Sequence, residues 1–232
     1  MEPRNSDARV PDGRIPGYRI ADLHIHSAYS HDSYLPPRLI VRKARAAGLT
    51  CIAVTDHGTI RGGVEAKRWA GKSPEIIVGT EIKTDCGDIT GLGVSSEIRS
   101  TGWEDVIREI RDKGGVVVFP HPCRGHSDIE EIAQRVDYIE CWNARSTPSQ
   151  NEGALRLARH YGKPVIAGSD AHVASEIGSV RACIGGNSFQ CQKILSARYA
   201  SEQEIRKSRI ISLVKQGKWG TLLSYGIRYL GR

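Results

Sequence analysis

The sequence predicts an α/β protein built on a parallel sheet or barrel and followed by a C-terminal helical appendage. Short strand-like runs alternate with amphipathic, helix-like segments from residue 20 to about residue 185. Several of these runs are almost entirely apolar, among them CIAVT, EIIVG and GVVVFP, which is typical of parallel strands covered on both faces. Glycines such as Gly48 and Gly162 follow the helix-like segments, where glycine commonly ends a helix.

The alternation defines each expected element. The expected strands are residues 20–25, 51–55, 76–80, 89–94, 116–120, 138–142, 164–168 and 181–184. The expected helices, which have apolar residues at helical spacing, are 37–47, 64–70, 103–113, 129–135 and 151–161. Segments 190–200 and 202–215 also look helical, and they are basic.

The length of 232 residues fits one domain with an extension. We expect residues 1–19 to form a flexible N-terminal arm, because they carry charge and proline but no apolar stretch, and residues 20–187 to form the barrel. Residues 188–232 would be a helical extension packed on the barrel. Large apolar residues between Trp219 and Leu230 would line its docking stripe, an interpretation favoured over a membrane or nucleic-acid helix.

The composition indicates the cellular compartment and the kinds of partner to expect. No apolar run approaches a membrane span, the first residues do not form a secretory signal, and the six cysteines form no CxxC pair. These features favour a reduced, cytoplasmic protein. The net charge of +7 allows attraction of phosphate or nucleic acid, but much of the excess lies after residue 190 and is better explained as a solvated basic face.

The first chemical signal is the run DLHIH. On a strand, residues two apart point the same way, so His24 and His26 would face one side together and could bind a metal. An HxH pair alone could also be two surface histidines. However, metal-competent residues follow or end five later strands, and five of the eight histidines lie at such positions. In a (β/α) barrel these strand ends share one face, so the pattern predicts a metal site there. The metal-competent residues at the later strand ends are His57, Glu81, His121, Glu140, Asp170 and His172.

In order along the chain, DLHIHS with Ser30 and Asp32, then TDHG, GTE, FPHP and GSDAH resemble the motifs of the PHP (polymerase and histidinol phosphatase) family. The resemblance covers roughly residues 20 to 175. It implies a distorted (β/α)7 barrel that binds two or three divalent metal ions, and most members hydrolyse phosphate esters.

The resemblance also implies the ligands. His24, His26, Glu81 and Asp170 would hold a first metal, and Glu81 would bridge to a second that His121 also binds. Asp32, His57 and His172 would hold a third. Glu140 stands where family members often have a histidine, so it is expected as a ligand, with support of another ligand as the alternative. The residues expected to act in catalysis are Glu81, Asp170 and His57.

Substrate contacts are expected from loops beside the strand ends. Arg124 and Arg145 could bind phosphate through their guanidinium groups, although either could be a surface residue, and Asn143 and His31 are further candidates.

Asp22 and Asp56 precede ligand histidines and could orient imidazoles or point outward. His126 and His160 are expected to face solvent. Mixed nitrogen and oxygen ligands suit Zn²⁺, Mn²⁺ or Fe²⁺.

Together these features predict a phosphoesterase in which metal-activated water attacks phosphorus. The substrate would be a small phosphomonoester or a nucleotide phosphate. A 3′–5′ exonuclease acting on nucleic acid is the alternative within the enzyme class. A non-catalytic barrel subunit of a nucleoprotein is the alternative from another class, and it gives no physical reason for the ligands to be present.

Overall fold

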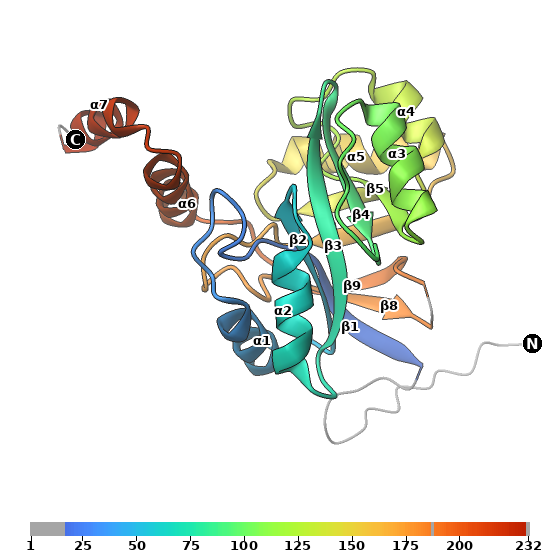
Figure 1. Ribbon diagram of the computed structural model, residues 1–232. Helices are drawn as coiled ribbons and strands as arrows, with labels where there is room; N and C mark the ends of the chain where they lie inside the picture. The colour runs from blue at the N-terminus through green and yellow to red at the C-terminus, as the bar shows by residue number, and fades with distance from the viewer. Residues whose placement is uncertain (1–16, 187, 231–232) are drawn as a thin grey trace, which may run out of the picture.

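The computed structural model describes residues 17–186 and 188–230, and of the last six of these it describes the backbone alone. Most of the predicted N-terminal arm therefore lies outside the described residues. The chain forms a mixed α/β fold in which helices flank part of a curved sheet (Figure 1). None of the described helices has both the length and the apolar character that crossing a membrane requires.

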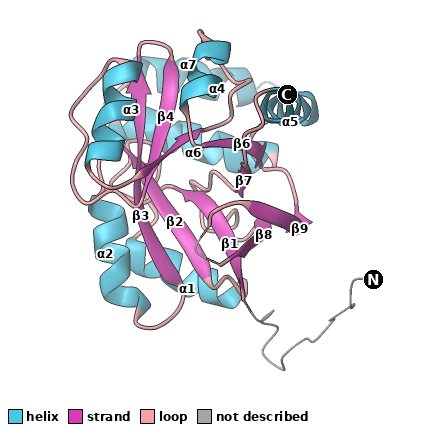
Figure 2. Cartoon of the chain, turned by 90° about the vertical axis from the view of Figure 1, so that its right-hand side faces the viewer, coloured by secondary structure: helices cyan, strands magenta, loops and turns pink. Residues whose placement is uncertain are grey.

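Within the described residues, nine strands form one sheet in the order β7-β6-β5-β4-β3-β2-β1-β8-β9. The sheet curls so that the segment after β7 returns to β1, where Ala171 forms a parallel bridge with Ile25, and the result is a nearly closed barrel (Figure 2). Its strands are β1 (Tyr18–Ile25), β2 (Cys51–His57), β3 (Glu75–Thr84), β4 (Gly87–Leu92), β5 (Val116–Phe119), β6 (Tyr138–Asn143), β7 (Val165–Gly168), β8 (Val180–Gly185) and β9 (Cys191–Ala197).

The expected parallel pairing holds for β1 with β2, β2 with β3, β5 with β6 and β6 with β7. It is wrong for β4, which is antiparallel to β3 and β5, and for β8, which is antiparallel to β1. In β4 the reason is the connection: only two residues join it to β3, and so short a turn can connect only antiparallel neighbours.

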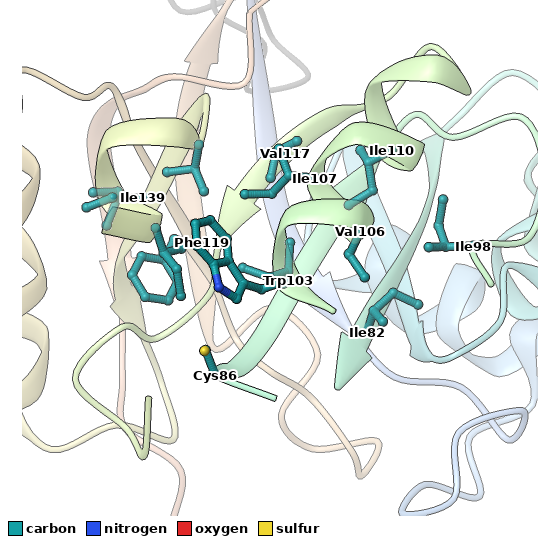
Figure 3. Close-up of a cluster of buried hydrophobic side chains, with 14 of the residues drawn as sticks. Ile82, Cys86, Ile98, Trp103, Val106, Ile107, Ile110, Val117, Phe119 and Ile139 are labelled. Carbon is teal, nitrogen blue, oxygen red and sulfur yellow. The ribbon is translucent and has the colours of Figure 1, made fainter. Parts of the chain in front are cut away.

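Helices cover the outer face of the sheet in two groups. Helices α1 and α2 pack over the first strands, where Ile40 of α1 and Ile52 of β2 belong to one buried cluster. Helices α3, α4 and α5 cover the strands on the other side of β3, and there Phe119, Ile110 and Ile139 are fully buried (Figure 3). The bounds are α1 (Pro37–Ala46), α2 (Arg61–Ala70), α3 (Trp103–Asp112), α4 (Ile129–Arg135), α5 (Pro148–His160), α6 (Glu202–Lys215) and α7 (Trp219–Leu230).

The helix expected over residues 190–200 is wrong, because most of this segment is strand β9, which is antiparallel to β8. Strand β8 offers an open edge, and pairing satisfies the backbone groups of both strands. The helix α6 begins only after Ser201, which forms a capping box with Glu204. The helix expected over residues 202–215 is confirmed with the same bounds.

The C-terminal helices differ in how they meet the rest of the molecule. On α6, Leu213, Ser208 and Glu204 are buried. Helix α7 follows the left-handed Gly217 and extends beyond α6, away from the sheet (Figure 1). Trp219 and Leu223 are 59% and 69% exposed, so these two residues are not buried in the predicted docking stripe. Packing of the extension as a whole stays a prediction, since its last side chains lie outside the described residues.

Candidate metal centre

The residues expected to bind metal come together where the strands end. His24 and Glu140 lie within β1 and β6, and the parallel register sets His57 of β2 beside Glu81 of β3. The remaining side chains come from the segments that follow β1, β5 and β7. All nine lie in one network of contacts, and seven of them are buried: His24, His26, Glu81, His121, Glu140, Asp170 and His172.

A first group of donor atoms surrounds one point. The Nε2 atoms of His24 and His26 are 3.1 Å apart, and they lie 3.3 and 3.2 Å from Glu81 Oε2. Asp170 Oδ1 is 3.6 and 3.3 Å from the same two nitrogens. Two ligands of a tetrahedral zinc ion, each about 2.1 Å from it, lie roughly 3.4 Å from each other. These four residues therefore fit a single metal ion.

The other oxygen of Glu81 faces a second group. His121 Nε2 is 3.0 Å from Glu81 Oε1. His121 and Asp170 have positive φ angles of 29° and 54°, which are uncommon for residues other than glycine. Such backbone conformations persist where the surroundings enforce them, often at functional sites. The Glu81 carboxylate thus lies between two groups, with Oε2 toward His24 and His26 and Oε1 toward His121.

A third group lies nearer to solvent. Asp32 Oδ2 is 2.9 Å from His172 Nε2 and 3.2 Å from His57 Nε2, and His26 completes a set of donors close enough to share an ion. His31 is beside this group but half exposed, with its Nε2 3.8 Å from Asp32.

The nitrogens on the far side of the rings are held by hydrogen bonds. His24 Nδ1 is 3.0 Å from Glu140 Oε1, His26 Nδ1 is 3.0 Å from Ser30 Oγ, and His172 Nδ1 is 2.7 Å from the Asp170 carbonyl. These contacts leave the three Nε2 atoms directed at the candidate ion positions, as hydrogen bonds to the far nitrogen do in metal-bound histidines.

Glu140 uses its second oxygen as well. Oε2 accepts hydrogen bonds from the His121 backbone N–H, at 3.0 Å, and from Asn143 Nδ2, at 2.9 Å. Both oxygens are therefore engaged with groups that carry or support ligands. Of the two roles considered for Glu140 from the sequence, this geometry favours support of other ligands.

The charge balance of the site suits cations. Burial alone would raise the pKa of Glu81 and of Asp170, but neighbouring charges, first of all His24, hold both pKa values well below their usual range. Burial and the nearby His26 lower the pKa of His172 to about 4, so this imidazole is neutral near pH 7, as a metal ligand must be. The ionised carboxylates and the neutral His172 suit a cation, whereas at His24 and His26 burial alone would lower the pKa but the same carboxylates raise it, for His26 to about 10.

Asp22 and Asp56 take neither of the roles expected for them. Asp56 accepts hydrogen bonds from the backbone N–H and the hydroxyl of Ser27, at 2.5 and 2.6 Å, and Asp22 accepts one from the Ser169 N–H at 2.8 Å. Both carboxyl groups are fully buried and anchor the loops that carry ligands. Burial raises the pKa of Asp22 to about 7.

A pocket of about 360 Å³ opens onto these groups and includes two of the four predicted substrate contacts. Arg124 and Arg145 line it, whereas Asn143 is buried beneath it and His31 lies outside its lining. Arg124 Nη2 is 2.7 Å from Asp170 Oδ2. Asp88 and Ile205 also line the pocket and were not expected from the sequence.

Arg145 is held on several sides. Its Nε and Nη2 donate to the two oxygens of Glu176, each at 2.9 Å, and Nη1 donates to Ser208 Oγ at 2.8 Å. The guanidinium therefore links α6 to the segment after β7, a contact that the sequence did not suggest.

His126 does not face solvent as expected. Its Nδ1 is buried, and its ring lies 5.5 Å from that of His121, centroid to centroid. Together with Asp88 these two histidines form a further set of possible ligand atoms. Asp88 itself binds His126 through its backbone N–H, 2.9 Å from Nε2.

Comparison with known proteins finds similar sequences and similar folds. A family model described as PHP-associated matches residues 148–200. An uncharacterized protein of Methanocaldococcus jannaschii is 40% identical over 114 residues, which are 47% of this chain and 66% of that protein.

Two solved structures share the fold. The first is a two-domain protein of Bacteroides vulgatus containing a predicted PHP-like metal-dependent phosphoesterase, with a TM-score of 0.63 and 19% identity over 82% of this chain and 62% of that chain. The second is a candidate metal-dependent phosphoesterase of Bifidobacterium adolescentis, with a TM-score of 0.59 and 18% identity over 84% and 96%. The chain spans slightly less than two thirds of the M. jannaschii and B. vulgatus proteins.

The molecule is thus a nearly closed α/β barrel whose strand ends carry grouped histidines and carboxylates that could hold metal ions. The family model matches only residues 148–200, and together with the ordered motifs it makes the chain similar to PHP proteins.

Proposed function

We propose that this protein is a metal-dependent phosphoesterase that hydrolyses a phosphate ester of a small molecule or nucleotide. The observation that carries the proposal is the position of Glu81. One carboxylate oxygen lies beside His24 and His26, and the other lies 3.0 Å from His121 Nε2. A carboxylate shared in this way suits a pair of neighbouring metal ions, the arrangement used in two-metal phosphoester hydrolysis.

The ligand roles expected from the sequence become part of this proposal, with Glu140 as a supporting residue. Two or three ions of Zn²⁺, Mn²⁺ or Fe²⁺ would polarise the phosphoryl oxygens and lower the pKa of the attacking water. Asp170 would hold its ligand position with the help of Arg124. His57 and Asp32 lie at the accessible side of the centre, where their side chains are 22% and 16% exposed. We propose that the ester group binds at this side.

Arg124 is the better of the two candidate arginines for phosphate contact. Its side chain is about one third exposed in the pocket, and only one of its terminal nitrogens is within 3 Å of Asp170. Arg145, in contrast, is bound by Glu176 and Ser208. We propose that Arg124 neutralises the non-bridging oxygens, while Arg145 shapes the pocket wall.

The pocket volume supports a small substrate over a polynucleotide. About 360 Å³ is at the lower end of the range for small-molecule sites, and a nucleotide or sugar phosphate would fill it. The exonuclease alternative needs an extended basic groove leading to the centre. A non-catalytic role would leave the buried ligand groups unexplained. The six cysteines are unpaired thiols, and on this ground we propose a cytoplasmic location.

A substrate panel tests the proposal. The purified protein, supplied with Mn²⁺ or Zn²⁺, is incubated with phosphorylated metabolites, nucleotides and short oligonucleotides, and phosphate or mononucleotide release is measured. Glu81→Ala serves as the control for contaminating phosphatases. Release from small esters, abolished in Glu81→Ala, is expected. Processive release of mononucleotides from oligonucleotides alone would favour the exonuclease, and no release from any substrate would favour a non-catalytic role.

A further inference from the structure

Lys215, near the end of α6, reaches from the C-terminal helix to a loop of the metal centre. Its Nζ donates hydrogen bonds to the backbone carbonyls of Ala28, Ser30 and Ser33, at 2.8, 2.5 and 3.0 Å. An ammonium group has three N–H donors, so all three are used on this loop. The same ammonium lies 5.1 Å from the centre of the Tyr34 ring.

The loop that Lys215 binds carries Asp32 and supports three histidines of the centre. Ser30 Oγ is 3.0 Å from His26 Nδ1 and accepts a hydrogen bond from the His57 backbone N–H at 2.9 Å. Ser33 Oγ is 3.0 Å from the carbonyl oxygens of both His26 and His172. The conformation of this loop therefore sets the positions of Asp32 and of the rings around it.

The first half of α6 is tied to the opposite side of the same group. Ser208 accepts a hydrogen bond from Arg145, and Arg145 pairs with Glu176. Glu176 in turn accepts a hydrogen bond from the His172 backbone N–H at 2.7 Å. Helix α6 thus connects with the segment that bears His172 at one end and with the segment that bears Asp32 at the other.

We infer that Lys215 is a positioning residue, which fixes the loop bearing Asp32 against His172 and so completes the third metal group. Three carbonyl oxygens that converge on one point repel one another unless a cation lies between them. Without the ammonium, the loop would open and Asp32 would lose its fixed place beside His172. This inference rests on the proposed function, because it assigns the third group to a metal ion.

The test is metal binding by the full chain rather than catalysis. Chelated protein is titrated calorimetrically with Mn²⁺ for the wild type, Lys215→Met and the matched control Lys207→Met, which changes an exposed lysine of the same helix. Loss of a residue that holds a metal ligand in place typically weakens metal binding by about 10- to 100-fold. For Lys215→Met we expect this loss of affinity in a single binding step, with the other steps unchanged. For Lys207→Met we expect every step to be unchanged.

A double-mutant cycle separates positioning from general stabilisation. In an Asp32→Asn background, which already lacks the ligand, Lys215→Met should change no remaining step by more than about twofold. Equal weakening of every step, or unchanged affinities in Lys215→Met, would overturn the inference. If Lys215→Met does not fold by circular dichroism, Lys215→Gln, which removes the charge but keeps an N–H donor group, replaces it, and an unaltered binding profile in that variant overturns the inference too. Absence of metal binding by the wild type would instead overturn the proposed function.

Discussion

The carboxylate of Glu140 and the imidazole of His24, 116 positions apart in the chain, meet at 3.0 Å between Oε1 and Nδ1. Both side chains are buried. The contact fixes the ring so that Nε2 faces His26 and Glu81, and a carboxylate bound to the far nitrogen makes an imidazole a stronger ligand.

Glu140→Gln should therefore weaken metal binding without removing an ion. We expect about a 10- to 100-fold loss of affinity at the first site, with the full number of ions bound once metal is saturating. Elemental analysis at saturating and limiting Mn²⁺ measures both quantities. Glu152→Gln, an exposed change on α5, is the control. Loss of one whole equivalent at saturation would instead identify Glu140 as a ligand.

Glu81→Ala should harm catalysis more than Arg124→Ala. Removal of Glu81 takes away the group shared by two candidate ions, so we expect kcat to fall by at least about 1000-fold. Arg124 would contribute mainly to phosphate binding, so its loss should raise KM by roughly 10- to 100-fold, with a smaller effect on kcat. Steady-state kinetics on the best substrate of the panel compares the two variants. Similar, mild effects would contradict the position assigned to Glu81.

Glu204→Gln should destabilise the protein in a pH-dependent way. Hydrogen bonds from Arg198, together with those from Ser175 and Ser201, hold the pKa of Glu204 well below its usual 4.5 despite opposing desolvation. A lowered folded-state pKa gives stability that is present above about pH 4.5 and is lost as the pH falls below it. We expect a loss of about 2 kcal/mol at pH 7, or roughly 4–8 °C in Tm.

Thermal unfolding at pH 7 and pH 3 checks this prediction. The difference between the wild type and Glu204→Gln should narrow at pH 3. Glu202→Gln, whose side chain is 85% exposed on the same helix, should change stability by no more than about 0.5 kcal/mol at either pH. A gap that is the same at both pH values would mean that the charge of Glu204 does not contribute.

The strand ends and the residues that follow them were predictable from the sequence. Each ligand lies next to an apolar run, and the residues of that run are enough to identify it as a strand. His24, His57 and Glu81 are examples: their places follow from strand position and parallel register. The antiparallel course of β4 could also have been anticipated from the short connection to β3. Strand β9 could not, since its pairing depends on the open edge of β8 rather than on its own pattern.

Contacts between distant segments were beyond sequence reasoning. The burial of Asp22 and Asp56 as loop anchors, and the reach of Lys215 across to Ala28, depend on how the chain closes on itself. A lysine on a basic helix looks like any solvated cation in the sequence. Only the fold shows which one meets three carbonyl groups.

The most direct test of the central claim is phosphate release before and after metal removal, measured with the metal content of the same samples. The protein is chelated, dialysed and then reconstituted with Mn²⁺ or Zn²⁺. We predict that two or three ions bind per chain, that chelation abolishes phosphate release, and that reconstitution restores it. Hydrolysis that survives in metal-free protein, or reconstituted protein that holds no stoichiometric metal, would contradict the account.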